Sequence, residues 1–597
     1  MTAREALKTY FGYDDFRPLQ EEIVQSVLDR RDTLALMPTG GGKSLCFQVP
    51  TMVMNGLCLV ITPLIALMKD QVENLRKRDI RAAAIYSGMS YEQQKVALDN
   101  CQWGPYHFLY VSPERLESEE FRERLSRLPI CLIAVDEAHC ISQWGYDFRP
   151  SYLKIAEIRD LIRHEGQEVP ILALTATATP EVVEDIQERL AFGSKHVLRK
   201  SFMRANLSYV VRQTNKKADE IVHILSKVPG SAIVYVRNRQ RAQELAAYLQ
   251  EKGISADYYH AGLSSKERSE KQEAWKAYRL LGERQEAMKQ GTRVVVATNA
   301  FGMGIDKPDV RMVIHHDLTD TIEAYFQEAG RAGRDEQRAF AVLLYDPSQD
   351  KAKARKRVVD NYPPKEFICD VYHKTCDFLG VGAGSGQGHT FMLPINDLCR
   401  IMHLPILQTY SALHLLTQAG YICFQEEQEI QPRVKILVSQ REIAEYGLSQ
   451  PQHQLLELLM RQYSGIFTDL QYVHLGDEAM RLLGERREAK GNEVRKQGAI
   501  HDLLVSLAQR HIITYIPHDT ANTLTFTRER QTDIYLPTHI YDKHRQQYIE
   551  KLKAMVEYAD NQLYCRSQLL LSYFGEADAA TCGCCDVCRS KAKEAKA

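Results

Sequence analysis

The segment Thr33-Leu34-Ala35-Leu36-Met37-Pro38-Thr39-Gly40-Gly41-Gly42-Lys43-Ser44 joins an apolar run to a glycine-rich loop. The apolar run predicts a buried strand, and the residues after Ser44 have helical periodicity, so the loop connects a strand to a helix. In that setting glycines let backbone N–H groups approach a phosphate, Lys43 neutralises phosphate oxygens, and the Ser44 hydroxyl can bind Mg²⁺. The strict motif has glycine where this chain has Met37, and a plain glycine turn is the alternative. The predicted ATP-binding residues of the loop are Thr39, Gly40, Gly41, Gly42, Lys43 and Ser44.

Further buried strands are predicted on both sides of this loop. From Asp32 to about Pro347, short apolar runs alternate with helical periodicity, the pattern of parallel strands connected by helices. A second series of runs begins at Ala232, which predicts two α/β lobes in tandem with a join near residues 204–213. We expect the first lobe at residues 1–205 and the second at 206–350, with one cleft between them.

Two charged motifs complete a predicted hydrolytic site in that cleft. Asp136 and Glu137 follow an apolar strand, where Asp136 would hold Mg²⁺ and Glu137 would orient or deprotonate the attacking water. In the second lobe, Arg331 and Arg334 lie three residues apart, and we predict that both project from one face of a helix. Such arginines can stabilise the charge that develops at the γ-phosphate. Taken alone, the acidic pair also fits a solvated turn, and the arginines a surface charge cluster.

The bulk composition is that of an ordinary globular protein. The chain has 597 residues, of which 44% are hydrophobic and 26% charged, and no stretch approaches about eighteen consecutive apolar residues. We therefore expect neither secretion nor a membrane span, and a cytoplasmic protein, in bacteria one of the nucleoid. The net charge of −1 gives no overall basic signature, so any nucleic-acid site must be local.

The alternation of predicted strands and helices stops after the second lobe. Helical patterns that end in an extended segment at 419–424, followed by another at 433–438, predict a helical connector and a winged helix within residues 351–450. A helix at 500–509, with extended segments at 512–515 and 523–526 that turn back on each other, predicts a second winged helix within 451–540. The turn between these last two segments is one candidate for a strand-separating hairpin, and a solvated hairpin is the alternative.

A cysteine cluster closes the chain and predicts a zinc module at residues 541–597. Cysteines separated by two residues can direct their sulfurs at one tetrahedral ion, and thiolates suit Zn²⁺. Cys584 is the spare cysteine, and a redox pair or an iron–sulfur cluster are the alternatives. The predicted zinc ligands are Cys565, Cys582, Cys585 and Cys588.

Further strings resemble the motifs of superfamily 2 helicases, and in detail those of the RecQ family. Each is weak alone, but their order and spacing are specific. They are residues 62–71, 111–116, 174–178, 259–263 and 297–306. The resemblance implies an α/β fold of two tandem RecA-like parallel-sheet lobes, followed by winged-helix-like segments and a C-terminal four-cysteine zinc module.

Two more groups of residues take their roles from this resemblance. Tyr13, Arg17 and Gln20 match the family's adenine-recognition motif, in which the ring and the guanidinium sandwich adenine and the amide bonds its edge. The string at residues 140–150 is similar to the aromatic-rich loop by which family members sense single-stranded DNA. Its predicted DNA-contacting residues are Gln143, Trp144, Phe148 and Arg149.

The resemblance implies an ATP-dependent DNA helicase that uses ATP, Mg²⁺ and Zn²⁺. It implies 3′-to-5′ movement on single-stranded DNA and unwinding of duplex or branched DNA in recombination and repair. It also implies single-strand-binding protein and topoisomerase as partners. A duplex translocase that does not separate strands and a DNA-binding scaffold with a relic motor are the rival functions.

This chain departs from the family pattern in three places. Tyr146 stands where many members have histidine, and residues 277–288 predict an extra helix before the strand at Val294. In the usual layout the zinc module follows the motor directly, whereas here roughly two hundred residues intervene between them. The element that would separate strands is therefore left open by the sequence.

Overall fold

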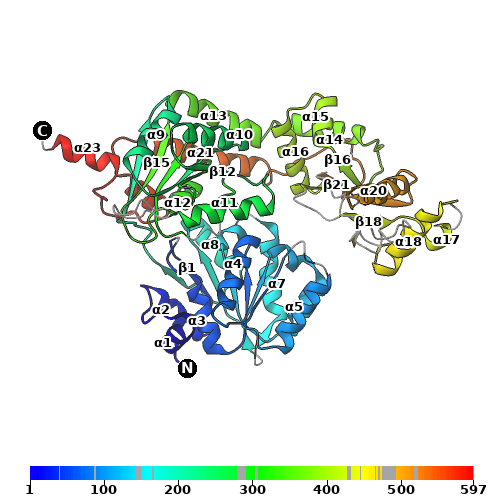
Figure 1. The fold of residues 1–597 in the computed structure, drawn as a ribbon, viewed down its shortest axis with the longest axis horizontal. Coiled ribbons are helices and arrows are strands. Elements are labelled where there is room, and N and C mark those ends of the chain that lie inside the picture. The colour runs from blue at the N-terminus through cyan, green and yellow to red at the C-terminus, as the bar shows by residue number, and fades with distance from the viewer. Residues whose placement is uncertain are drawn as a thin grey trace. The chain divides into compact units, whose positions relative to one another are not determined.

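The computed structural model of the chain describes two compact units, Met1–Ala354 with Gln547–Ala597, and Arg355–Gln546 (Figure 1). Among the described residues, no helix is both long and apolar enough to cross a membrane. The described residues are all of 1–597 except 39, 87–88, 90, 143–148, 165–166, 279–290, 303–306, 427–431, 444–445, 464, 468–470, 474–492, 517–521 and 596–597.

The first lobe is a seven-stranded parallel sheet with the strand order β3-β4-β2-β5-β8-β1-β9. Its strands are almost continuously buried, as expected when helices cover both faces of a parallel sheet. The strands are β1 (Thr33–Leu36), β2 (Leu57–Ile61), β3 (Ala82–Ile85), β4 (Phe108–Val111), β5 (Ile130–Val135), β8 (Ile171–Thr175) and β9 (Val197–Arg199). The helices are α1 (Ala3–Ala6), α2 (Gln20–Leu28), α3 (Leu45–Met54), α4 (Ile65–Arg76), α5 (Tyr91–Trp103), α6 (Glu119–Leu125), α7 (Lys154–Leu161) and α8 (Pro180–Arg189).

The second lobe is a six-stranded parallel sheet with the order β10-β15-β14-β11-β13-β12. Its first strand begins at Leu207, so the join between the lobes is residues 200–206, slightly earlier than the sequence predicts. The predicted extra helix at 277–288 falls almost wholly outside the described residues, and α11 ends at Ala277. The strands are β10 (Leu207–Gln213), β11 (Ser231–Tyr235), β12 (Ala256–Tyr259), β13 (Val294–Ala297), β14 (Val310–His315) and β15 (Ala339–Tyr345). The helices are α9 (Lys217–Lys227), α10 (Arg239–Glu251), α11 (Ser265–Ala277), α12 (Ile322–Ala329) and α13 (Pro347–Asn361).

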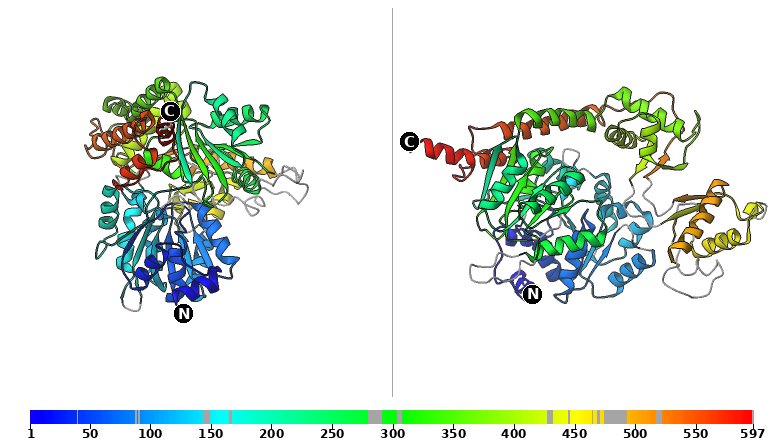
Figure 2. Two further views of the ribbon diagram at one scale, coloured as in Figure 1. Left: turned by 90° about the vertical axis from the view of Figure 1, so that its left-hand side faces the viewer. Right: turned by 45° about the horizontal axis from the view of Figure 1, so that its top comes forward.

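The C-terminal segment belongs to the same unit as the two lobes and lies beside the second lobe in both views of Figure 2. Its helices are α21 (Asp542–Asp560), α22 (Arg566–Tyr573) and α23 (Asp586–Glu594). Asp586 accepts a hydrogen bond of 3.0 Å from the backbone N–H of Val211 in β10, and the Tyr345 hydroxyl donates to Asp560 at 2.8 Å. The motor and the zinc segment are thus one structural unit although 192 residues, Arg355–Gln546, separate them in sequence.

Arg355–Gln546 contains two three-stranded antiparallel sheets, and its strands do not pair as the sequence predicts. One sheet has the order β16-β21-β17 and the other β19-β18-β20. The first set of elements is α14 (Lys365–Phe378), β16 (Thr390–Leu393), α15 (Ile395–Ile401), α16 (Ile406–Gln418), β17 (Ile422–Gln425) and β21 (Asn522–Phe526). The second set is β18 (Arg433–Ile436), α17 (Gln440–Ile443), α18 (Gln450–Gln462), β19 (Gln471–Tyr472), α20 (Glu493–Gln509) and β20 (Ile513–Ile516).

The physical reason for this pairing is that each sheet has its own hydrophobic core. Phe424 of β17 and Leu524 of β21 lie in one buried cluster, while Val434 of β18 and Ile513 of β20 lie in another. The order α14, β16, α15, α16, β17, β21 is that of a winged helix whose last two strands are separated by a second small domain. The predicted turn between β20 and β21 therefore connects two sheets, and its residues 517–521 lie outside the described part of the chain.

Candidate nucleotide and metal sites

The glycine-rich loop lies between β1 and α3, as predicted, and upstream side chains hold it in shape. Gln20 is 1% exposed, and its Nε2 donates a 3.0 Å hydrogen bond to the carbonyl oxygen of Gly42. Arg17 donates from Nη1 to the carbonyl oxygen of Gly40 at 2.9 Å. Gly42 has φ +79°, and a Cβ on it would lie 2.3 Å from Gln20 Nε2, so glycine is required there. Thr39 lies outside the described residues.

The three residues that resemble an adenine motif are placed differently from one another. The polar ends of Arg17 and Gln20 contact carbonyl oxygens of the loop, whereas the Tyr13 side chain is 47% exposed. The structure therefore ties Arg17 and Gln20 to the shape of the phosphate loop. Their contact with adenine stays a prediction.

Lys43 and the acidic pair meet where β5 ends. Lys43 Nζ lies 3.7 Å from Glu137 Oε1, and His139 Nδ1 lies 3.5 Å from Glu137 Oε2. Lys43 Nζ and Glu137 Oε2 are buried and make no hydrogen bond to any described residue. Leaving a buried polar atom without a hydrogen-bond partner costs free energy. The cluster therefore suits a ligand that supplies hydrogen-bond partners for these two atoms. A phosphate chain with a divalent cation fits these side chains. The phosphate oxygens would accept hydrogen bonds from Lys43, and the cation would pair with the carboxylates.

The two carboxyl groups of the acidic pair have opposite electrostatic settings. Burial, and next the charge of Glu137, raises the pKa of Asp136 to about 6. Burial acts on Glu137 too, but Lys43, His139 and Arg331 outweigh it, so the pKa of Glu137 is lowered. Glu137 is therefore ionised at neutral pH. Asp136 is buried with too little positive charge nearby to offset the cost of ionising it. A cation bound at Asp136 would remove that deficit and favour the carboxylate.

Both predicted arginines of the second lobe lie next to the first lobe's site. The Arg334 side chain packs against Gly40 of the phosphate loop. It lies so close that a Cβ added to Gly40 would be 3.1 Å from Arg334 Cγ. Arg331 is 6% exposed, lowers the pKa of Glu137, and donates to the carbonyl oxygen of Gly302. The prediction that they share a helical face is wrong, because α12 ends at Ala329 and the arginines follow in consecutive turns.

The residues predicted to contact DNA fall almost entirely outside the described part of the chain. Gln143, Trp144 and Phe148 belong to the omitted segment 143–148. Arg149 is described: its backbone N–H donates to the carbonyl oxygen of Cys140 at 2.8 Å, and its Nη1 lies 3.8 Å from Glu114 Oε1. The two ends of the loop are thus hydrogen-bonded to each other, while the DNA contact stays a prediction.

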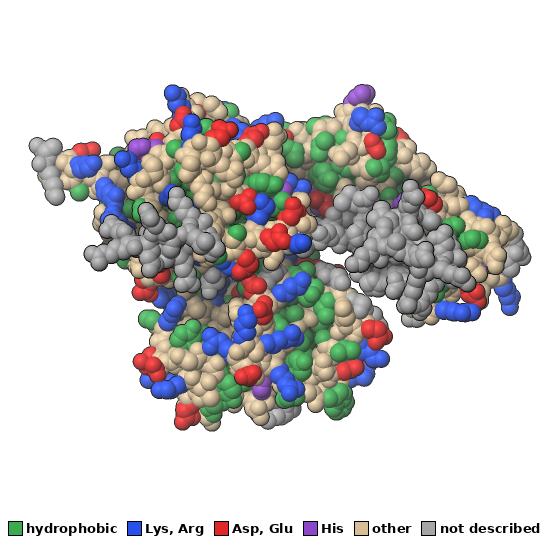
Figure 3. Space-filling view, viewed as in Figure 1, with side chains coloured by type: hydrophobic (Ala, Val, Ile, Leu, Met, Phe, Trp, Pro, Cys, Tyr) green, Lys and Arg blue, Asp and Glu red, His purple; other side chains and the backbone are tan. Residues whose placement is uncertain are grey.

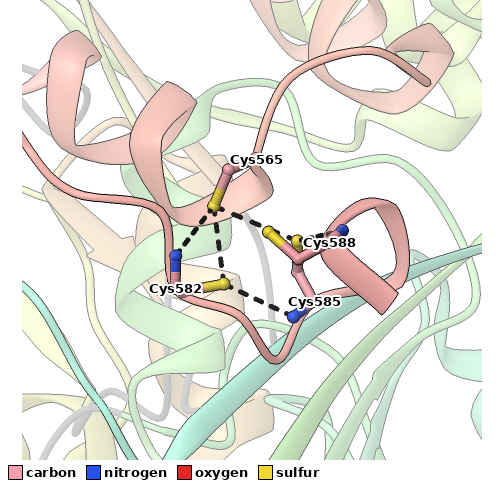
Figure 4. A group of neighbouring side chains, drawn as sticks. All are labelled: Cys565, Cys582, Cys585 and Cys588. Atoms are coloured by element: carbon pink, nitrogen blue, oxygen red, sulfur yellow. Dashed lines mark hydrogen bonds between the residues drawn. The ribbon is translucent and has the colours of Figure 1, made fainter. Parts of the chain in front are cut away.

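Four cysteines of the C-terminal segment form a metal-sized cluster, as the sequence predicts (Figure 4). The sulfur atoms of Cys565, Cys582, Cys585 and Cys588 all lie within 4.8 Å of one another. Backbone N–H groups donate to three of the sulfurs at 3.3–3.4 Å, which favours the thiolate form that a metal needs. The pKa of Cys582 is lowered, chiefly by a hydrogen bond from Cys585. This donor set fits a tetrahedral Zn²⁺, and Cys584 Sγ instead faces the carbonyl oxygen of Leu207 at 3.9 Å.

Residues that flank the zinc ligands contact the two lobes. The sequence does not predict these contacts. Glu576 accepts hydrogen bonds from the hydroxyl of Ser201 at 2.7 Å and the backbone N–H of Phe202 at 2.8 Å, both in the join between the lobes. The Phe574 ring packs on Phe202 and on Phe326 of α12, with centroids 5.5 and 5.0 Å apart. No local sequence pattern identifies the partners of Phe574 and Glu576, because those partners lie more than two hundred residues away in sequence.

Replacing Cys585 by serine (Cys585→Ser) is expected to lower the zinc content from about one ion per chain and to reduce thermal stability. Zinc bound by four thiolates contributes on the order of 10 kcal/mol to a small site, and a hydroxyl is a poor replacement for a thiolate. Elemental analysis and thermal unfolding measure the two effects. Cys584→Ser is the matched control, since its sulfur is adjacent in sequence but outside the cluster. Unchanged metal stoichiometry in Cys585→Ser would refute the ligand assignment, and iron in place of zinc would favour a cluster.

Three family models match the chain: DEAD/DEAH box helicase at residues 17–186, Helicase conserved C-terminal domain at 216–336, and RecQ zinc-binding at 521–589. The ATP-dependent DNA helicase RecQ of Pasteurella multocida is 41% identical over 348 residues, 58% of this chain and 52% of that protein. This chain thus spans about half the length of that relative.

A second relative is covered more completely. The probable ATP-dependent DNA helicase RecS of Bacillus subtilis is 41% identical over 351 residues, 58% of this chain and 67% of that protein. The RecQ helicase of the same organism is 42% identical over 347 residues, 58% of this chain and 56% of that protein. Together with the parallel-sheet lobes and the four-cysteine cluster, these matches show that the chain belongs to the RecQ family of superfamily 2 helicases.

Proposed function

We propose that this chain is an ATP-dependent DNA helicase that moves 3′-to-5′ on single-stranded DNA and unwinds duplex or branched DNA in recombination and repair. The single observation that carries the proposal is the position of Arg334, a residue of the second lobe, against Gly40 of the first lobe's phosphate loop. Hydrolysis then depends on how the two lobes approach each other. The DNA helicases that the chain matches support ATP and DNA as its ligands.

Each side chain of the site has a defined task in this mechanism. Lys43 neutralises the β- and γ-phosphate oxygens, and Ser44 with Asp136 would hold Mg²⁺, which would supply further positive charge against those oxygens. Glu137, held ionised by Lys43, His139 and Arg331, orients the attacking water and accepts its proton. Arg331 and Arg334 stabilise the charge on the departing γ-phosphoryl group from the opposite lobe.

A buried hydrogen-bond path supports the coupling of this site to DNA. His139 Nδ1 lies 3.0 Å from Thr175 Oγ1, and that hydroxyl is 3.2 Å from the carbonyl oxygen of Thr177. Both threonines lie in the string 174–178, one of those that resemble superfamily 2 helicase motifs. A change at the γ-phosphate that moves Glu137 would reach this string through His139, because buried polar contacts of this kind have few alternative partners.

Surface charge gives less guidance to the path of the DNA. On the face seen in Figure 3, Lys and Arg side chains are interspersed with Asp and Glu over both lobes. This mixture of charges agrees with the net charge of −1. We infer that grip on DNA depends on local loops such as the one that ends at Arg149. Single-strand-binding protein and topoisomerase stay predicted partners.

In a strand-displacement assay, the wild-type chain is expected to separate forked and 3′-tailed DNA with ATP and Mg²⁺. Blunt and 5′-tailed duplexes should be separated far more slowly, because the first strand contact requires a 3′ single-stranded tail. ATPase activity should be stimulated by single strands. Stimulation by blunt duplex alone, without displacement, would favour the rival duplex translocase, and preference for 5′ tails would refute the polarity.

A further inference from the structure

The catalytic peptide between Asp136 and Glu137 has a backbone shape that needs external support. Glu137 adopts φ 47° and ψ 47°, the left-handed region that residues with a Cβ rarely occupy. Such a conformation persists only where surrounding contacts hold it, and it recurs at functional sites. The contacts that hold this peptide therefore also set the direction in which the Glu137 carboxylate points.

Tyr152 supplies one of the contacts that hold this peptide. Its hydroxyl donates a 3.0 Å hydrogen bond to the carbonyl oxygen of Asp136, the oxygen of the peptide that leads into Glu137. The side chain is completely buried, in a short helical turn spanning Pro150–Leu153. Burial raises the pKa of Tyr152 well above its usual value, so the phenol keeps its proton and stays a donor.

The same residue is joined to the end of the predicted DNA-sensing loop. The backbone N–H of Tyr152 donates to the carbonyl oxygen of Arg149 at 3.0 Å, and that of Arg149 donates to Cys140 at 2.8 Å. The N–H of Cys140 in turn donates to the carbonyl oxygen of Glu137 at 2.9 Å. With the Tyr152 hydroxyl on Asp136, these four hydrogen bonds form a closed ring through the catalytic peptide and the loop end.

We propose that Tyr152 is a positioning residue that holds the Asp136–Glu137 peptide in its left-handed shape and transmits DNA contact at Arg149 to Glu137. The inference rests on the proposed function. Movement of Arg149 on DNA shifts the Tyr152 turn, because both residues belong to one hydrogen-bonded ring. The hydroxyl then shifts the Asp136 carbonyl, and with it the direction in which Glu137 presents its carboxylate to water.

The test is Tyr152→Phe, which removes the hydroxyl and keeps the buried ring. We expect kcat for ATP with single-stranded DNA to fall about tenfold, equivalent to the ~1.4 kcal/mol of a lost buried hydrogen bond. The ratio of DNA-stimulated to basal kcat should fall as well. KM for ATP and affinity for single-stranded DNA should stay within about twofold, since the hydroxyl is completely buried and bonded to the Asp136 carbonyl oxygen. A role in packing alone would not produce this split.

Tyr209→Phe is the matched control, because the Tyr209 ring is 3% exposed and its hydroxyl has no hydrogen-bond partner among the described residues. Thermal unfolding of both variants, and rates normalised to nucleotide-binding sites, separate function from loss of folded protein. A stimulation ratio in Tyr152→Phe equal to that of wild type overturns the proposal, whatever the stability. Wild-type protein without any DNA-stimulated hydrolysis would instead refute the proposed function.

Discussion

Replacing Lys43 by alanine is expected to abolish ATP hydrolysis, lowering kcat by about 10³-fold or more, while single-stranded DNA binding is retained. Lys43 Nζ is a buried ammonium that makes no hydrogen bond to the described residues and lies 3.7 Å from Glu137. It is therefore placed to receive phosphate oxygens, and its removal leaves their charge without a counter-ion. Steady-state ATPase assays and equilibrium DNA-binding titrations measure the two properties separately.

Lys95→Ala is the control for this prediction. Lys95 is an exposed residue of α5 in the same lobe, so its loss should change neither hydrolysis nor DNA binding. If Lys43→Ala still unwound forked DNA with ATP, the assignment of the motor site would be wrong. If the wild-type chain hydrolysed no ATP at all, the rival reading of a scaffold with a relic motor would gain support.

Replacing Arg334 by alanine is expected to lower kcat about 10³-fold with little change in KM for ATP. Arginines that reach the γ-phosphate from a second domain act on the transition state rather than on nucleotide binding. Arg334 comes from the second lobe and packs on Gly40 of the phosphate loop, which is the placement such a residue needs. Single-turnover and steady-state hydrolysis with DNA present give kcat, and a fluorescent nucleotide gives the affinity.

Two further variants sharpen this test. Arg334→Lys keeps the charge but loses the planar fork, so we expect only partial recovery of kcat. Arg338→Ala removes a nearby exposed guanidinium, 5.4 Å from the centroid of Phe340, and should leave hydrolysis unchanged. A loss in Arg334→Ala that appears in KM alone would mean that the residue binds ATP without acting in the chemical step.

The positions of the residues in the proposed nucleotide site could be predicted because each part of the site is local in sequence. The glycine-rich loop needs only the strand before it and the helix after it, and Asp136 and Glu137 need only the end of β5. Three of the four predicted zinc ligands are also local, because Cys585 caps α23, Cys588 lies in its first turn and Cys582 comes shortly before it. What the sequence pattern misplaced was the helical face for the arginines, since α12 already ends at Ala329.

The strand pairing between residues 390 and 526 could not be predicted in the same way. An extended segment shows its buried face through alternation, but nothing in that alternation identifies its partner strand. Adjacent segments were expected to pair, whereas β17 pairs with β21 and β18 with β20. The partners are chosen by burial in two separate cores, one around Phe526 and one around Leu504.

By itself, the sequence predicted the family, the two lobes, the phosphate loop, the acidic pair and the four-cysteine cluster, because motif order and spacing within the sequence encode each of them. Only the tertiary structure decided that Arg334 meets Gly40, that Glu576 contacts the join between the lobes, and that Tyr152 holds the Asp136 carbonyl. Those contacts join residues that are distant in sequence or on different elements. They follow from how whole elements pack, and the packing free energy depends on all of the buried surface together.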